Sequence, residues 1–352
     1  MISAGKRRFV TVRVSRLTGL IIATTALTGI SLVSAGAAFA APAAHQTNLF
    51  ISTSGSSAQY GQISGQLGPA LNSVSEVTLA FATFSSSGTA SLPALNSGLV
   101  SLLQSMPNAT IALSVGGAVA SQASWSAALA NPGAFASSLV TAEHALRSEF
   151  GNPVAADIDD EYPTSAQKSS MTRLIQDVAS QTRAPVTVEV GTYDYVGFNL
   201  PAIARTGGVL VDVMAIDNAY GSATATDNAS GAQAVAEVQQ IMSAGVPAGQ
   251  LSVELPAYGM EFPGVTQFGQ AYARGTLTPV ADTALAGLPV TEYPSRIASS
   301  TMLNGSLVSM QSPADITQAL AQMASLGVTD DSLWQASQAT LPVIQAAESN
   351  GG

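Results

Sequence analysis

The sequence contains no cysteine and only two histidines, His45 and His144. The lack of cysteine excludes disulfides, thiolate metal sites and a cysteine nucleophile. Two histidines this far apart do not favour a histidine metal cluster or a Ser-His-Asp triad. His144 lies in the stretch TAEHALRSEF and is expected to be an ordinary helical residue. We therefore expect neither a metal nor a cofactor.

Basic residues are also scarce, with 12 Lys and Arg against 22 Asp and Glu. All of the acidic residues but only seven of the basic ones lie beyond residue 40, so residues 41–352 carry a formal charge of −15. Such a balance argues against nucleic acid and against anionic membrane surfaces as partners.

The first 40 residues are typical of a secretory signal peptide. A basic start precedes the apolar stretch LTGLIIATTALTGISLVSAGAAFA, which ends in the small-x-small pattern Ala38-Phe39-Ala40. The alternative is a membrane anchor, because the stretch is near the length of a spanning helix. Its small residues and its cleavage-like end favour removal. We expect a secreted, soluble protein that begins near Ala41.

Residues 41–352 alternate between apolar, strand-like runs and helical stretches, and eight such runs can be counted. This alternation predicts one (β/α)8 TIM barrel, with an open doubly wound sheet as the second choice. No G-x-G-x-x-G motif follows any run, which disfavours the open sheet. Roughly 70 residues separate the seventh run from the eighth, so we expect only a modest insertion there. The runs are 48–52, 76–84, 110–117, 154–161, 186–193, 209–217, 251–259 and 331–337.

One of these runs ends in a cluster of acids, AADIDDEYP at residues 155–163. Side chains alternate along a strand, so Asp157, Asp159 and Glu161 should face the barrel axis, and Ile158 and Asp160 should face the other way. Repulsion and burial would raise at least one pKa among the inward acids, as a general acid requires. The alternatives are a solvated acidic turn and a cation site, although an EF-hand loop would have glycine where Tyr162 stands.

The cluster resembles the D-G-x-D-x-D-x-E signature, often followed by Y-P, of family 18 glycoside hydrolases, the chitinase family. Val154 and Ala155 replace the first Asp and the Gly. Further resemblances follow in order and span essentially all of residues 41–352. They are SVGG at 114–117, MAID at 214–217, PAYG at 256–259 and Trp334.

This resemblance implies a hydrolase that cleaves β-1,4 bonds after N-acetylglucosamine, in chitin or a related glycan. Its members have no protein nucleophile, because the substrate's own 2-acetamido oxygen attacks the anomeric carbon. By resemblance Glu161 is the general acid and base, Asp159 orients the acetamido group, and Asp157 shares a proton with Asp159. Four further residues are candidates for contacts to the sugar: Asp217, Tyr258, Trp334 and Tyr220. A monomer is expected.

Ile216 stands where the family usually has a tyrosine that hydrogen-bonds the acetamido oxygen. Tyr220, Tyr193 or Tyr195 could supply a hydroxyl instead. The second hypothesis is therefore a catalytically silent barrel that binds sugar or protein. Silent relatives commonly lose the glutamate, whereas Glu161 is retained, which favours the enzyme.

The low content of aromatic residues, 6%, predicts a short, shallow cleft. The shortage of basic residues predicts an enzyme that tolerates acid and has a rate optimum below neutrality, because few positive charges repel once the carboxylates are neutralised.

Overall fold

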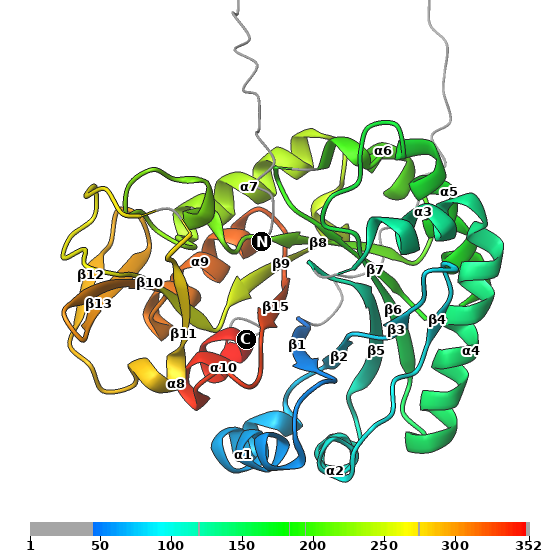
Figure 1. The fold of residues 1–352 in the computed structure, drawn as a ribbon, viewed down its shortest axis with the longest axis horizontal. Coiled ribbons are helices and arrows are strands. Elements are labelled where there is room, and N and C mark those ends of the chain that lie inside the picture. Colours follow the sequence, from blue (N-terminus) through cyan, green and yellow to red (C-terminus); the bar gives the residue numbers. More distant parts are fainter. Residues whose placement is uncertain (1–44, 119, 183, 194, 274, 350–352) are drawn as a thin grey trace, which may run out of the picture. The chain divides into compact units, whose positions relative to one another are not determined.

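The computed structural model describes residues 45–118, 120–182, 184–193, 195–273 and 275–349, so the expected signal peptide at 1–40 lies outside the described residues. Eight parallel strands close into a barrel in the order β1-β15-β9-β8-β7-β6-β5-β2 (Figure 1). The predicted (β/α)8 architecture is confirmed. The strands are β1 Thr47–Ser52, β2 Glu76–Ala80, β5 Thr110–Gly116, β6 Val154–Asp159, β7 Val186–Val190, β8 Val209–Met214, β9 Leu251–Pro256 and β15 Asp330–Trp334.

Each barrel strand falls within or next to one of the eight predicted runs, but most strands end earlier than predicted. β6, for example, stops at Asp159, whereas the run was predicted to continue to Glu161. The residues that were predicted as strand but are not part of it always lie at the carboxyl end of the strand. There the chain leaves the sheet to form the loops above the barrel. Glu161 is consequently a loop residue and not a strand residue.

Helices form the outer layer around the barrel (Figure 1). Residues 122–150 form two helices, because Pro132 lacks an N–H group and is tolerated only at a helix start. In the described part of the chain no helix is both long and apolar enough to cross a bilayer. The outer helices are α1 Ser57–Leu67, α2 Ser97–Gln104, α3 Gln122–Ala130, α4 Pro132–Phe150, α5 Lys168–Gln181, α6 Leu200–Ile203, α7 Gly231–Ser243, α9 Pro313–Ser325 and α10 Leu341–Glu348.

The hydrophobic core lies between the barrel wall and the helices. On β6 the outward side chains Val154, Ala156 and Ile158 are fully buried and belong to one cluster with Leu139 of α4 and Leu174 of α5. Burying each large aliphatic side chain of this kind contributes about 1.5–3 kcal/mol. This layer fixes which residues of each strand are left to face the barrel interior.

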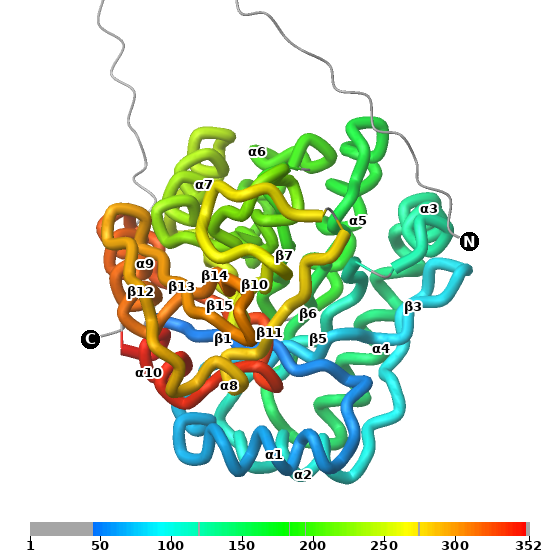
Figure 2. Tube along the Cα trace, turned by 60° about the vertical axis from the view of Figure 1, so that its left-hand side comes forward, coloured from blue at the N-terminus to red at the C-terminus, as the bar shows by residue number. Residues whose placement is uncertain are grey.

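The segment between β9 and α9 forms a second sheet, with the order β11-β10-β14-β13-β12 and antiparallel pairing (Figures 1 and 2). It has its own small core, which includes Met260, Phe262 and Leu307. The prediction of only a modest insertion was wrong, because short hairpin strands pack many residues into a compact sheet. Its elements are β10 Tyr258–Phe262, β11 Thr278–Ala281, α8 Asp282–Leu285, β12 Val290–Tyr293, β13 Ala298–Leu303 and β14 Ser306–Met310; a hairpin of β3 Thr83–Phe84 and β4 Ala90–Ser91 follows β2.

A capping box returns the chain from this insertion to the barrel. The Ser312 hydroxyl accepts a hydrogen bond from the Asp315 N–H at 3.2 Å, and the Asp315 carboxylate accepts one from the Ser312 N–H at 2.8 Å. Pro313 occupies the first helical position. Together these residues define the start of α9, which leads into the last barrel strand.

Candidate active site

The two acids of β6 point into the barrel. Asp157 is 1% exposed and Asp159 is 5% exposed, whereas Ile158 between them faces the helices, as the alternation predicts. Asp157 lies in register with Ser114 of β5 on one side and with Thr187 of β7 on the other. Two carboxyl groups therefore stand one above the other in a narrow, water-poor interior.

Glu161 lies just beyond the carboxyl end of β6 and is half-buried. Its carboxylate raises the pKa of Asp159 and also that of Glu254 on β9, so it stands near both. The acids Asp157, Asp159 and Glu161 thus form a column that rises from the interior to the barrel mouth. We call these three residues the acid column.

Burial is the main cause of the raised pKa values in the acid column. It raises the pKa of Asp157 to about 7, with Asp212 adding to the effect and the Ser114 hydroxyl opposing it. The pKa of Asp159 lies well above its ordinary value, because it is buried and because Asp157 and Glu161 repel its charged form. A carboxyl column of this kind holds protons near neutrality, which is the state that general acid catalysis needs.

Asp160 follows β6 directly and is buried as well. Burial raises its pKa to about 6, and the Tyr162 N–H, 3.4 Å away, counteracts this by donating to the carboxylate. It therefore belongs to the loop that supports Glu161.

Gly116 and Gly117 allow β5 to pass very close to β6. A Cβ atom at position 116 would stand 1.8 Å from the Asp159 carbonyl oxygen, and one at 117 would stand 2.4 Å from the Phe81 ring. The Gly117 N–H donates to the same Asp159 carbonyl at 2.9 Å. The glycines of the SVGG stretch therefore fix the position of Asp159.

An aromatic group lies at the barrel mouth around Trp334. Its ring stacks on Phe81 with centroids 5.9 Å apart, and it is tilted against Phe50 at 5.3 Å. Trp334 is half-buried, so part of the indole is open to a ligand. Phe50 and Phe81 were not recognised as site residues from the sequence, although each stands near the carboxyl end of a strand.

Asp217 and Tyr258 are joined by a short hydrogen bond in which the Tyr258 hydroxyl donates to an Asp217 carboxylate oxygen. Asp217 has a left-handed backbone, φ 59°, just after β8. Tyr258 is buried and is the first residue of β10, so the PAYG stretch belongs partly to the insertion and not, as expected, to the seventh barrel strand alone. The bond connects the sixth-strand loop to the insertion.

Ile216 is half-buried and offers no hydroxyl. Among the tyrosines considered as substitutes, Tyr220 is exposed and lies close enough to Asp217 for that carboxylate to raise its pKa, although burial contributes more. Tyr193 is 70% exposed, and its hydroxyl donates to the Asn218 side-chain oxygen at 3.2 Å. Tyr195 packs against the outer core.

Three further buried acids face the barrel interior and were missed in the sequence: Glu189, Asp212 and Glu254. Glu76, at the start of β2, is half-buried. Glu189 is paired in register with Asp212, and Ser332 of β15 donates to Asp212 at 2.5 Å. Each acid is the single charged residue within its strand, as in VTVEV and LSVEL. This isolated charge is the sequence feature by which these acids could have been recognised as residues of the barrel interior. We call Glu189, Asp212 and Glu254 the inner acids.

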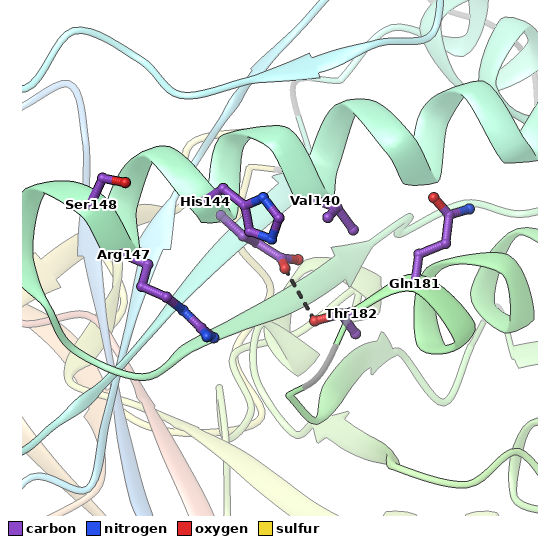
Figure 3. A pocket seen from close by; sticks show the side chains of 7 residues that line it. Val140, His144, Arg147, Ser148, Gln181 and Thr182 are labelled. Atoms are coloured by element: carbon purple, nitrogen blue, oxygen red, sulfur yellow. Dashed lines mark hydrogen bonds between the residues drawn. The ribbon is translucent and has the colours of Figure 1, made fainter.

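In the described part of the chain, no group of three or more histidines or acids is placed to hold a metal ion. His144 lies on α4, in a hollow of about 520 Å³ on the outer helical layer (Figure 3). The acid column points into the barrel instead, so His144 is not part of it. The hollow is lined by Val140, Glu143, His144, Arg147, Ser148, Gln181 and Thr182.

Solved structures with the same fold include a chitinase of Trichuris suis, 15% identical with a TM-score of 0.71, covering 88% of this chain and all of that one. A chitinase-like agglutinin of Robinia pseudoacacia is 16% identical, with a TM-score of 0.68 and coverage of 87% and 99%. A family 18 chitinase of Cycas revoluta, solved with allosamidin, is 14% identical, with a TM-score of 0.68 and coverage of 87% and 100%.

None of the curated proteins matches the sequence significantly. The family model of glycosyl hydrolases family 18, in contrast, matches residues 49–322. This range includes the acid column, six complete barrel strands and most of β1. The chain therefore belongs to glycosyl hydrolase family 18.

Proposed function

We propose that this protein is a secreted, monomeric, chitinase-like hydrolase that cleaves β-1,4 bonds at N-acetylglucosamine with retention of configuration. The observation that carries the proposal is the acid column, in which Glu161 stands at the barrel mouth directly above the buried pair Asp159 and Asp157. Barrel enzymes place their chemistry at this end of the strands. The fold relative from Cycas revoluta has been solved with (GlcNAc)4, which supports a glycan of this class.

In the proposed reaction, Glu161 protonates the oxygen of the leaving sugar. The 2-acetamido oxygen of the substrate attacks the anomeric carbon, and the bond to the leaving oxygen breaks. Asp159 holds the acetamido N–H and stabilises the positive oxazolinium ion, while Asp157 shares its proton with Asp159. Glu161, now a carboxylate, then takes a proton from the water that opens the ring.

The other site residues have binding roles in this proposal. Trp334, backed by Phe81 and Phe50, offers an apolar face to the reacting sugar. The linked pair Asp217 and Tyr258 and the exposed Tyr220 supply polar groups to the sugar's hydroxyls and acetamido oxygen.

The second candidate is a silent barrel that binds sugar without cleaving it. Ile216 favours it, because the hydroxyl expected at that position is missing, and one fold relative is an agglutinin. Product analysis on defined chito-oligosaccharides separates the two. Shorter oligosaccharides support the hydrolase, whereas tight binding without any product supports the silent barrel.

Substrate-assisted catalysis makes a prediction about the substrate. Oligosaccharides with a free 2-amino or 2-hydroxyl group on the reacting sugar should not be cleaved, because they lack the attacking oxygen. Acetylated substrates should release the β-anomer first, and proton NMR during the first minutes of reaction distinguishes the anomers. Initial release of the α-anomer would contradict the mechanism.

A further inference from the structure

The hollow on the outer helical layer lies where α4 packs against α5, outside the barrel wall. Its volume of about 520 Å³ is within the range of sites that hold small molecules. Residues three, four, seven and eight apart on a helix share one face, so α4 presents a continuous row of side chains to the hollow. In Figure 3 the side chains of Val140, His144, Arg147 and Ser148 come from α4, and those of Gln181 and Thr182 come from the carboxyl end of α5.

Glu143 is the buried polar residue of this hollow, with only 2% of its surface exposed. Its carboxyl oxygen Oε2 accepts a hydrogen bond from the Thr182 hydroxyl at 3.1 Å. The other oxygen, Oε1, has no hydrogen-bond partner among the described residues. Buried carboxyl oxygens are normally paired with protein, water or a ligand. The unpaired Oε1 therefore indicates a hydrogen-bonding group that comes from outside the chain.

His144 and Arg147 supply nitrogen donors beside Glu143, and both are exposed. Arg147 forms no ion pair with any described residue, although it is close enough to Glu143 to lower the pKa of that carboxyl. Positive charge is scarce in this chain, which has 12 Lys and Arg against 22 Asp and Glu. A guanidinium without an acidic partner favours an anionic group on a ligand, and its planar fork matches a carboxylate.

The remaining groups of the hollow suit hydroxyls. Burial raises the pKa of Glu143, while the Thr182 hydroxyl and Arg147 oppose the effect. A raised pKa favours the neutral carboxyl, which hydrogen-bonds to hydroxyls and does not repel an anion held by Arg147. The Ser148 hydroxyl and the Gln181 carboxamide add further donors and acceptors. The lining thus matches one carboxylate and several hydroxyls on a single small molecule.

We propose that this hollow is a binding site for a polyhydroxylated carboxylic acid, such as a uronic or aldonic acid. Arg147 and His144 bind the carboxylate. Glu143 pairs with a hydroxyl through Oε1, and Gln181 and Ser148 bind other hydroxyls. This site is independent of the proposed function, because it lies outside the barrel wall and shares no residue with the acid column.

The two histidines of the chain allow a direct test, because each labelled imidazole gives its own NMR signals. His144 lines the hollow, whereas His45 is paired with Asp331 at 3.1 Å and serves as the internal control. Glucuronate, added at constant pH and ionic strength, should move the His144 signals saturably and leave those of His45 unchanged. The variant His144→Gln assigns the signals. Glucose lacks the carboxylate and propionate lacks the hydroxyls, so each should bind about tenfold more weakly or worse.

Arg147→Gln should weaken the binding of glucuronate by about tenfold or more, because it removes the charge-assisted hydrogen bonds to the carboxylate. Arg173→Gln is the matched control. Arg173 is an exposed arginine of α5 that pairs with Asp177 at 3.8 Å and does not line the hollow, so its loss should leave the affinity unchanged. Both arginines are exposed, so both variants should fold.

Four results would overturn the proposal. The first is a His144 signal that does not move with glucuronate, and the second is equally strong binding of glucose or propionate. The third is an unchanged affinity in Arg147→Gln. The fourth is an equal loss of affinity in Arg173→Gln, which would mean that the ligand responds only to the overall charge of the protein.

Discussion

Glu161→Gln is expected to lower the rate of chito-oligosaccharide hydrolysis by about a hundred- to ten-thousandfold. The amide keeps the shape of the side chain but has no proton to give to the leaving oxygen. Because Glu161 is only half-buried at the barrel mouth, the exchange should leave the fold intact. Circular dichroism and binding of (GlcNAc)4 by calorimetry should therefore match the unmodified protein.

Asp160→Asn is the natural comparison, because it makes the same kind of change one residue earlier on a carboxyl group that has no role in the proposed proton transfer. It should retain the greater part of the rate. Near-normal turnover in Glu161→Gln would end the assignment of Glu161. Loss of folding in that variant would instead show that its carboxylate supports the loop.

The protein should be more stable in mild acid than at neutral pH. Burial raises the pKa of Glu76 to about 8, that of Asp157 to about 7 and that of Asp212 to about 6. In the unfolded chain these groups titrate near pH 4. Between about pH 4 and pH 8 the folded protein holds protons that the unfolded chain has already lost, so each increase in pH lowers the free energy of unfolding.

The expected effect is large, because a shift of one unit corresponds to about 1.4 kcal/mol and several groups contribute. For a chain of this size we expect the melting temperature to be about 10 °C lower at pH 8 than at pH 5. Thermal unfolding followed by circular dichroism across this range measures it. The shortage of basic residues acts in the same direction, since it keeps repulsion weak below pH 4.

Glu76→Gln tests the cause of this dependence. The variant removes one of the raised groups, so it should be more stable than the unmodified protein at pH 8 and show a shallower dependence on pH. Its stability at pH 4, where Glu76 is protonated in both states, should change little. A melting temperature that rises from pH 5 to pH 8 would refute the expectation.

Much of the fold could be predicted because the outward residues of the barrel strands carry a strong pattern. Val154, Ala156 and Ile158 alternate with inward residues, and the same period recurs in all eight strands. The carboxyl ends of the strands could not be predicted, because the loops above the barrel begin with residues similar to those of the strands. The insertion was underestimated, because its short strands alternate polar and apolar residues over too few positions to be recognised.

The site was predictable where the chemistry lies within one segment. Asp157, Asp159 and Glu161 are neighbours in the sequence, and alternation indicated the common direction of the two that lie on β6, Asp157 and Asp159. The inner acids come from three other strands, and only closure of the barrel brings them close to the acid column. The partnership of Asp217 and Tyr258 likewise depends on the insertion, which the sequence pattern did not reveal.

The barrel closes where β1 pairs with β15, and this seam joins the two ends of the described chain. Thr47 lies in register with Asp331, 284 residues later, and His45 forms an ion pair with Asp331 at 3.1 Å. The ring of strands cannot close before β15 has been synthesised, so closure is a late step of folding. Contacts between residues so far apart in the sequence also slow folding. Until that closure the interior carboxyls remain in contact with water and ionise freely, so acid should speed the last step of folding as well as stabilise its product.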